Sequence, residues 1–173
     1  MKHRRLLLVI VMIMTATEAF TQSSTFGIKA GSSHVYANGI DFFKSLGYYA
    51  GVTYEEKALN SLTGFSLETI FINQLHTVGG VTSANHILTA SVGPTFYFKE
   101  SLPLYVAIGG QAGYDIGYRI NGDWTGFDTG IRFGGYAGLN YTFGLVQLQA
   151  KYIRELDARN MMQLGINYRF RQI

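Results

Sequence analysis

Hydrophobic and polar residues alternate with a period of two through most of this 173-residue chain. That period is typical of β-strands, because successive side chains of a strand point to opposite faces. The pattern recurs about eight times, over residues 26–33, 46–55, 62–73, 87–98, 104–119, 128–143, 145–152 and 163–170. The clearest segment places Val146, Leu148 and Tyr152 on one face and Gln147, Gln149 and Lys151 on the other. The alternation therefore predicts an all-β protein of eight antiparallel strands.

The two faces of these strands differ in the size of their side chains. The polar face combines long charged residues with the glycines 51, 93, 109, 113, 134, 138 and 165, whereas the apolar face is rich in aromatic residues. Small residues beside long ones suit the interior of an eight-stranded barrel, which side chains just fill. A soluble lipocalin-type barrel has the opposite polarity, with its apolar face inside. We therefore expect an up-and-down transmembrane β-barrel whose apolar face contacts lipid.

The charged residues of the polar face form the first candidate site. Buried charges persist only when they are paired and hydrogen-bonded, so we expect these side chains to pair across the interior and leave no wide pore. The predicted interior charge network comprises Lys29, Glu55, Glu68, Asp115, Arg119, Arg132, Lys151 and Arg169.

The connections between the strands alternate in length. Residues 55–60, 99–103 and 142–144 read as short turns, and residues 36–45, 75–85, 121–127 and 156–160 read as mostly longer loops. Outer-membrane barrels keep their periplasmic turns short and their outer loops long. Alternate strands also share a Gly-x-x-aromatic spacing that ends at Tyr54, Phe96, Tyr141 and Tyr168. These aromatic residues are expected to form one ring at the inner lipid–water boundary.

The first 21 residues are expected to be removed before the barrel folds. A basic start (Lys2, Arg4 and Arg5) precedes the apolar run 6–14 and a segment of small residues, as in a secretory signal peptide. Cleavage is expected after Ala19 or Thr21, with Thr21 favoured, and cleavage after Thr21 leaves residues 22–173 as the barrel domain. No later apolar stretch reaches the 18 residues or so that a membrane-spanning helix requires.

Charge and composition narrow the possible functions. Without residues 1–21, the chain has 11 basic and 10 acidic residues, so the basic isoelectric point is mostly due to the signal peptide and gives no support for nucleic-acid binding. The chain contains no cysteine, which excludes disulfides and lipoprotein processing. Glycine makes up about 12% of the chain, but the glycine-rich stretches lack the following helix that a phosphate-binding loop needs. We expect no cofactor and no enzymatic activity.

Two resemblances extend this interpretation. Residues 163–170 resemble the C-terminal signal that the barrel-assembly machinery recognises. The polar position of that signal falls on Gln163, the small position on Gly165 and the two aromatic positions on Tyr168 and Phe170. Three further residues follow Phe170. The mature chain, from FGIKAG at 26–31 to NYRF at 167–170, resembles the PorT-type outer-membrane β-barrel family of Bacteroidota, with an OmpA- or OmpX-like barrel. That resemblance implies a fold and a location in the outer membrane, but it implies no catalytic motif.

Other candidate sites rest on weaker patterns. His76 and His86 flank the predicted loop 75–85 and could face each other across its base, but no third metal ligand is evident. Ser33 and His34 are adjacent and therefore lie on opposite faces of a strand, which argues against a Ser/His/acid catalytic set with Glu68. Aromatic and apolar residues in the predicted outer loops are candidates for an adhesive tip, namely Ile40, Phe42, Phe43, Trp124 and Phe127.

The leading hypothesis from the sequence is a non-enzymatic outer-membrane barrel with a plugged, charge-paired interior and a structural or interaction-mediating role. Its expected partners are outer-membrane lipid and, during biogenesis, the barrel-assembly machinery. Two alternatives stay open: an accessory component of an envelope secretion or assembly system, with unknown protein partners, and an outer-leaflet lipid-modifying enzyme.

Overall fold

Antiparallel strands account for almost all of the described chain. The computed structural model describes residues 21–36, 45–58, 61–78, 80–99, 102–126, 130–156 and 159–170. The predicted signal peptide lies outside these residues except for Thr21, and so do Ile40, Phe42, Phe43 and Phe127. The strands are β1 (Thr21–Tyr36), β2 (Leu46–Ala58), β3 (Thr63–Val78), β4 (Val81–Tyr97), β5 (Leu104–Ile120), β6 (Asp123–Gly126), β7 (Ile131–Phe143), β8 (Val146–Glu155) and β9 (Asn160–Phe170).

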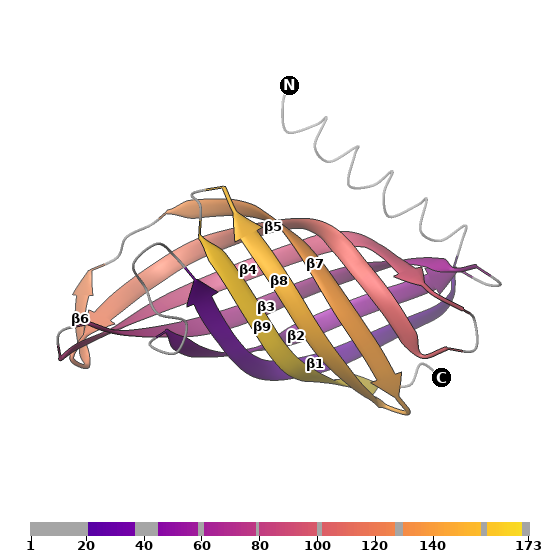
Figure 1. Ribbon diagram of the computed structural model, residues 1–173, viewed down its shortest axis with the longest axis horizontal. Helices are drawn as coiled ribbons and strands as arrows, with labels where there is room; N and C mark the ends of the chain where they lie inside the picture. The colour runs from indigo at the N-terminus through magenta and orange to yellow at the C-terminus, as the bar shows by residue number, and fades with distance from the viewer. Residues whose placement is uncertain are drawn as a thin grey trace, which may run out of the picture.

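Within the described residues, eight of these strands close into a barrel (Figure 1). Each strand pairs with its neighbours in the chain, β5 pairs with β7, and the antiparallel ladder between β1 and β9 completes the cylinder. The predicted eight-stranded antiparallel barrel is therefore confirmed. The short β6 pairs only with the end of β5 and lies at the far left in Figure 1.

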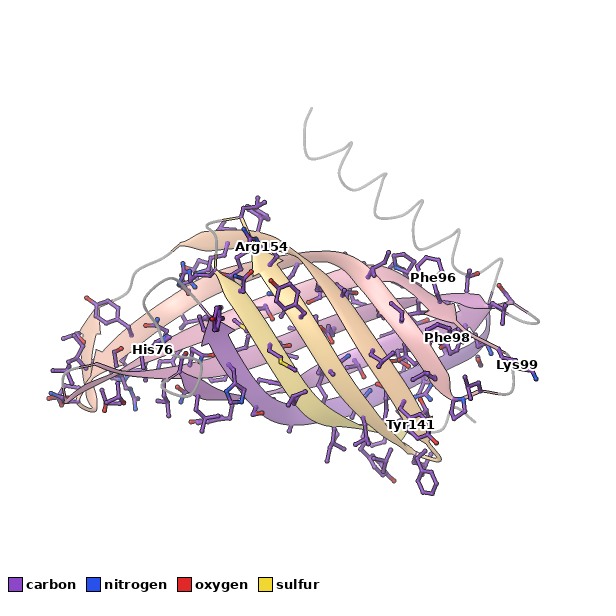
Figure 2. The ribbon with its side chains drawn as sticks, viewed as in Figure 1. His76, Phe96, Phe98, Lys99, Tyr141 and Arg154 are labelled. Atoms are coloured by element: carbon purple, nitrogen blue, oxygen red, sulfur yellow. The ribbon has the colours of Figure 1, made fainter. Side chains whose placement is uncertain are left out.

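The faces of the strands follow the alternation seen in the sequence. In β8, Gln147 and Lys151 are buried, whereas Leu148 and Tyr152 are half exposed. The aromatic residues predicted to form a ring lie toward the ends of β2, β4, β7 and β9 that adjoin the short connections. Figure 2 shows Phe96, Phe98 and Tyr141 around that end of the barrel. The polar face therefore lies inside the barrel and the apolar face outside.

Two predicted loops are wrong, because strands extend through most of them. The ladder between β3 and β4 continues to the pair Val78–Val81, although residues 75–85 read as a loop. Polar pairs such as Thr77–Thr82, whose hydroxyl oxygens lie 3.2 Å apart, continue this hairpin without apolar alternation. Residues 121–127 also contain β6, which follows a two-residue turn in which Asn121 and Gly122 both have positive φ. Asn-Gly is the favoured pair for such a turn and was the missed signal in the sequence.

Apolar residues also share the interior with the polar ones, which the sequence analysis did not predict. The buried apolar cluster includes Val35, Ile70, Ile72, Ile87, Ile153 and Met161. Ile70 and Ile72 occupy the same face of β3 as Glu68, so extending the period of two beyond Glu68 would have found them. The interior is therefore a mixed core in which apolar and charged side chains share one narrow space.

Tyr49 shows why glycine is needed on the inner face. Its buried ring lies against Gly31 and Gly165, which are opposite each other on β1 and β9. A Cβ atom at Gly31 would lie 2.8 Å from Tyr49 Cζ, and a Cβ atom at Gly165 would collide with the Tyr49 hydroxyl. At Gly31 the backbone of β9 also blocks a side chain, because a Cβ atom there would collide with the Leu164 carbonyl oxygen, whereas at Gly165 the Tyr49 hydroxyl is the nearest obstacle. Gly138, on the inner face of β7, has no neighbour closer than 3.6 Å to such a Cβ atom.

This difference predicts that Gly165→Ala destabilises the barrel and Gly138→Ala does not. Overpacking a well-filled core costs about 1–3 kcal/mol, whereas Gly138→Ala meets no close neighbour and should leave the free energy of unfolding unchanged or raise it by up to about 1 kcal/mol. Urea unfolding of the refolded proteins, followed by the fluorescence of the single tryptophan, measures both changes. Equal stability of the two variants would show that Tyr49 does not fill this part of the core.

Candidate functional site

Three charged side chains from three strands meet in the middle of the barrel. Lys29 extends from β1, Glu68 from β3 and Lys151 from β8, and each is almost completely buried. Lys29 Nζ lies 2.5 Å from Glu68 Oε2, and Lys151 Nζ donates a hydrogen bond to the other oxygen, Oε1. Glu68 therefore bridges two ammonium groups that come from distant parts of the chain. We call these three residues the central triad.

Neutral side chains hold both lysines of the central triad in place. Lys29 Nζ also donates to Gln149 Oε1 at 2.5 Å, and Lys151 Nζ donates to Ser91 Oγ at 2.9 Å. Lys151 Nζ in addition lies 4.1 Å from the centre of the Tyr136 ring, within the range of a cation–π interaction. The surplus positive charge of the triad is thus shared among polar and aromatic neighbours. Such partners are what a buried charge needs to remain ionised.

A second cluster surrounds Glu55, toward the end of the barrel with the short connections. Tyr105 donates its hydroxyl to Glu55 Oε1, and Gln147 Nε2 donates to the same oxygen at 3.1 Å. Arg169 Nη2 lies 3.4 Å from Glu55 Oε2. Glu55 therefore joins β2, β5, β8 and β9 across the interior.

A third cluster lies at the opposite end of the barrel. Arg132 Nε donates to Asp115 Oδ2 at 2.6 Å, and Arg132 Nη1 lies 3.7 Å from Glu155 Oε2. Arg159 Nε lies 3.6 Å from the same oxygen of Glu155. The sequence analysis did not include Glu155 or Arg159. Glu155 follows Lys151 and Ile153 on the inner face of β8, so the alternation could have revealed it, but Arg159 precedes its strand and carries no such signal.

The structure thus brings seven of the eight predicted interior residues into three clusters. The exception is Arg119, for which the described residues provide no carboxylate partner. Its guanidinium carbon instead lies 4.4 Å from the centre of the Trp124 ring. Arg119 is near the tip of the β5–β6 hairpin, where the strands extend past the rest of the barrel. It therefore supports the hairpin rather than the interior clusters.

The four residues that resemble an assembly signal all lie in β9, which pairs with β1 to close the barrel. Gln163 is buried inside, and Tyr168 and Phe170 are exposed outside with their rings in an edge-on contact at 5.6 Å. Recognition of this strand by an assembly machinery remains a prediction.

His76 and His86 do not face each other, contrary to the arrangement that the sequence analysis considered. His76 lines an interior cavity, whereas His86 lies on the outside, stacked on Phe71 at 5.8 Å and near Trp124 at 5.1 Å. The residues between them form a hairpin rather than a loop, and the two side chains are on opposite sides of it. The described residues contain no group of three or more His, Cys, Asp or Glu side chains suited to a metal ion.

Ser33 and His34 point in opposite directions, as their adjacency in a strand requires. Ser33 is fully buried and donates to Gln74 Oε1 at 2.7 Å, which is a structural role within the core.

Among the residues that the structure describes, no helix has the length and apolar character needed to cross a membrane.

Comparison with solved structures identifies the fold. The Ail protein (attachment invasion locus) of Yersinia pestis superposes with a TM-score of 0.52 at 20% identity, covering 85% of this chain and 97% of Ail. Neisserial surface protein A superposes with a TM-score of 0.60 at 14% identity, covering 86% of this chain and 100% of that protein. These identities show a shared fold and no more. No protein-family model and no curated protein matches the chain, so membership of the PorT-type family remains a prediction.

The central triad makes a testable contribution to stability. Glu68→Gln should leave two buried lysines without a counter-charge and cost about 3–5 kcal/mol of unfolding free energy. Asp123→Asn removes an exposed carboxylate in β6 and should change it by less than about 0.5 kcal/mol. Adding Lys151→Met to Glu68→Gln should restore part of the loss, because one unpaired ammonium group is then gone. Urea titration of the refolded variants tests all three, and equal effects of Glu68→Gln and Asp123→Asn would contradict the pairing.

Proposed function

We propose that this protein is a small integral outer-membrane β-barrel with a plugged, charge-paired interior and a structural or interaction-mediating role. The observation that carries the proposal is the reversed polarity of the barrel. Large apolar side chains such as Phe133, Leu148 and Ile166 are more than half exposed, whereas Lys29 and Lys151 are buried. Soluble proteins bury charged side chains rarely and do not expose apolar ones around an entire circumference. A hydrocarbon environment accounts for both features.

The outer surface of the barrel has an apolar zone with aromatic residues at both edges, as a bilayer would require. Its strands are 10 to 17 residues long, apart from β6, and a tilted strand needs about 9–11 residues to cross a membrane. The aromatic ring ends the apolar zone on the side of the short connections. On the other side, Asn73 Nδ2 donates to the Tyr48 hydroxyl at 2.5 Å, and the Tyr152 hydroxyl donates to Asn160 at 2.7 Å. Aromatic residues with polar partners are typical of the lipid–water interface.

Four arguments favour the outer membrane over other membranes. The predicted signal peptide would export the chain, and the end of β9 resembles the signal for barrel assembly. Closed antiparallel barrels are the spanning form found in outer membranes. The fold is also shared with Ail and with Neisserial surface protein A. The partners in this proposal are outer-membrane lipid and, during biogenesis, the barrel-assembly machinery.

The interior supports a plug rather than a pore. The central triad and the buried apolar cluster occupy the middle of the barrel, and the other two charged clusters lie toward its two ends. The cavity between Glu55 and Glu68 has a volume of only about 10 Å³, which is room for about one water molecule. The larger cavities, of about 250 and 260 Å³, lie at the two ends of the barrel. No observation of this kind favours the accessory-component or the lipid-modifying hypothesis.

The position of the membrane predicts that arginine substitution has different effects at two exposed leucines. Leu164 is 43% exposed near the middle of β9, and Leu156 is 84% exposed beyond the end of β8. Arginine on the lipid face near the midplane costs about 2–4 kcal/mol and close to nothing near the interface. Leu164→Arg should therefore reduce the protein recovered from carbonate-washed outer membranes, and Leu156→Arg should not. A soluble barrel would tolerate both changes, and recovery of the wild type in the soluble periplasm would contradict the proposal.

The plug predicts a low conductance. In planar bilayers the purified protein should show no large, stable channel steps, because no continuous lumen passes the central triad. A known porin reconstituted in the same way serves as the positive control. Steady steps comparable with those of the porin would rule out a plugged interior.

A further inference from the structure

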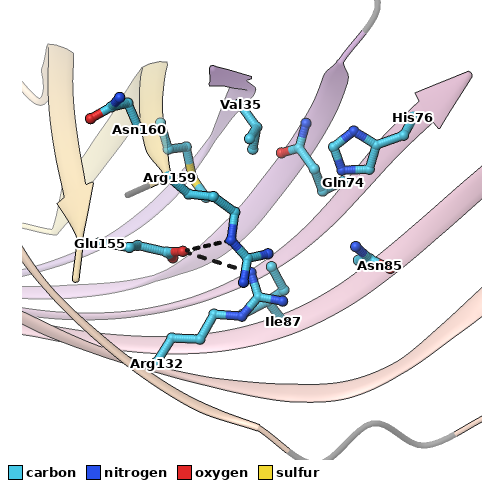
Figure 3. Close-up of a pocket in the computed structure, with 10 residues that line it drawn as sticks. Val35, Gln74, His76, Asn85, Ile87, Arg132, Glu155, Arg159 and Asn160 are labelled. Atoms are coloured by element: carbon cyan, nitrogen blue, oxygen red, sulfur yellow. Dashed lines mark ion pairs between the residues drawn. The ribbon is translucent and has the colours of Figure 1, made fainter. Parts of the chain in front are cut away.

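The cavity at the β3–β4 end of the barrel contains charges that neutralise one another (Figure 3). Glu155 lies 3.7 Å from Arg132 and 3.6 Å from Arg159. The outside of the barrel carries a different kind of cation, Arg154, which is exposed at the end of β8 opposite the short connections (Figure 2). Arg154 donates to Asn160 at 3.1 Å and has no carboxylate partner among the residues that the structure describes.

A groove in the apolar outer surface runs alongside β8 toward Arg154. It has a volume of about 490 Å³ and involves β5, β7, β8 and β9. The short side chains of Ala137 and Ala150 leave this space, and larger side chains border it, namely Val106, Leu139, Tyr152 and Met162. Lys151 contributes only its backbone, because its ammonium group lies inside the barrel against Glu68. The groove is therefore apolar along its length, and the nearest outward charge on β8 is Arg154, two residues beyond Tyr152.

The groove stays open at its end toward Arg154. Gly135 is opposite Arg154 in the β7–β8 ladder, and Gly110 is opposite Gly135 in the β5–β7 ladder. Both glycines are exposed on the outside. A Cβ atom would meet nothing within 4 Å at Gly110 and only a carbonyl oxygen at 3.7 Å at Gly135, so the packing of the barrel does not require glycine at either position. Glycine weakens a strand and often occurs where a ligand or another backbone approaches closely.

The groove also has the depth of one leaflet of a membrane. Ala150 pairs with Leu164 near the middle of β9, and Arg154 is the penultimate residue of β8. The segment from Ala150 to Arg154 extends about 13 Å along the strand, and half of a hydrocarbon core is about 15 Å thick. The Tyr152 hydroxyl and Arg154 both donate to Asn160 Oδ1, which holds them at the same boundary. An acyl chain in the groove would therefore bring its head group to Arg154.

We propose that this groove binds one acyl chain of a phosphorylated lipid of the outer leaflet, with the phosphate of that lipid against Arg154. The inference rests on the proposed function, because a membrane-spanning barrel presents this surface to lipid. Arginine pairs with phosphate through parallel charge-assisted hydrogen bonds. At the edge of an apolar zone, the charge of Arg154 is stabilised by such an anion.

A second copy of the chain suits the groove less well than a lipid does. A twofold pair across the groove would bring the Arg154 side chains of both copies together at the same depth. The outward positions of β7, β8 and β9 contain no Asp or Glu that could neutralise them. Like charges placed side by side oppose association. The charge of this surface therefore favours an anionic lipid.

Dioleoyl phosphatidic acid is a suitable probe. Dioleoylglycerol provides the same chains without the phosphate, and inorganic phosphate provides the anion without the chains. The refolded full barrel in nonionic detergent is titrated with each probe, bound lipid is measured by native mass spectrometry, and backbone amide shifts in NMR spectra locate it. We expect phosphatidic acid to bind and to shift the amides of residues 135–139 and 150–154. The other probes should bind at least tenfold more weakly.

Two pairs of variants test the two parts of the site. Arg154→Gln should weaken phosphatidic acid binding about tenfold or more, the typical effect of a lost charge-assisted hydrogen bond. Its control is Lys99→Gln, which removes an exposed charge at the other end of the barrel and should bind as the wild type does. Ala137→Phe fills the groove and should weaken binding by a similar factor. Its control is Ala90→Phe, on the outside of β4 away from the groove.

Several outcomes would overturn the proposal: equal binding of phosphatidic acid and dioleoylglycerol, equal effects of a variant and its control, or amide shifts elsewhere on the barrel. A wild-type dimer that Ala137→Phe alone dissociates would assign the groove to a second copy instead. The shifts of the wild type decide the location even if a variant fails to fold. Recovery of the wild type in the soluble periplasm would contradict the proposed function itself, whereas a barrel that stays in outer membranes and binds no phosphatidic acid would overturn only this inference.

Discussion

Charged side chains inside this barrel have to find their partners within the narrow space that eight strands enclose. Glu68 illustrates the constraint, because it neutralises Lys29 from one side of the cylinder and Lys151 from the other. None of the three could leave the interior without crossing the wall of strands. Removing ions from water is expensive, and only close pairing with further hydrogen bonds offsets that cost. The positions of Gln149, Ser91 and Tyr136 around the lysines follow from this requirement.

The same limit on space explains where small residues occur. Tyr49 reaches across the interior only because β1 and β9 have glycine where its ring passes. Glycine and long side chains are therefore complementary parts of one packing arrangement. The apolar cluster of Ile70, Ile72 and their neighbours fills the space that the charged groups leave. A barrel with more strands would leave a lumen instead of a packed interior.

The two ends of the barrel differ in construction. At one end the strands are joined by short connections, and a ring of outward aromatic residues surrounds them. At the other end the β3–β4 and β5–β6 hairpins extend the sheet, and the side chain of Asn121 accepts a hydrogen bond from the Thr82 amide at 3.2 Å. The cavity with its two arginines lies inside this second end.

The sequence by itself determined the strands, their two faces and the closed barrel, because the period of two is a local property that each strand carries independently. It also indicated that residues such as Lys29 and Glu68 share the interior. It did not determine which charges would meet, because that depends on the tilt and register of strands that are far apart in the chain. Glu68 binds Lys29, which is 39 positions earlier in the chain, and Lys151, which is 83 positions later. Arg159, whose Nε atom lies 3.6 Å from Glu155, precedes its strand, so the period of two gives no information about it. The hairpin through residues 75–85 was likewise decided by tertiary pairing, since its polar sequence lacks the pattern that marks a strand half-buried in the wall of the barrel.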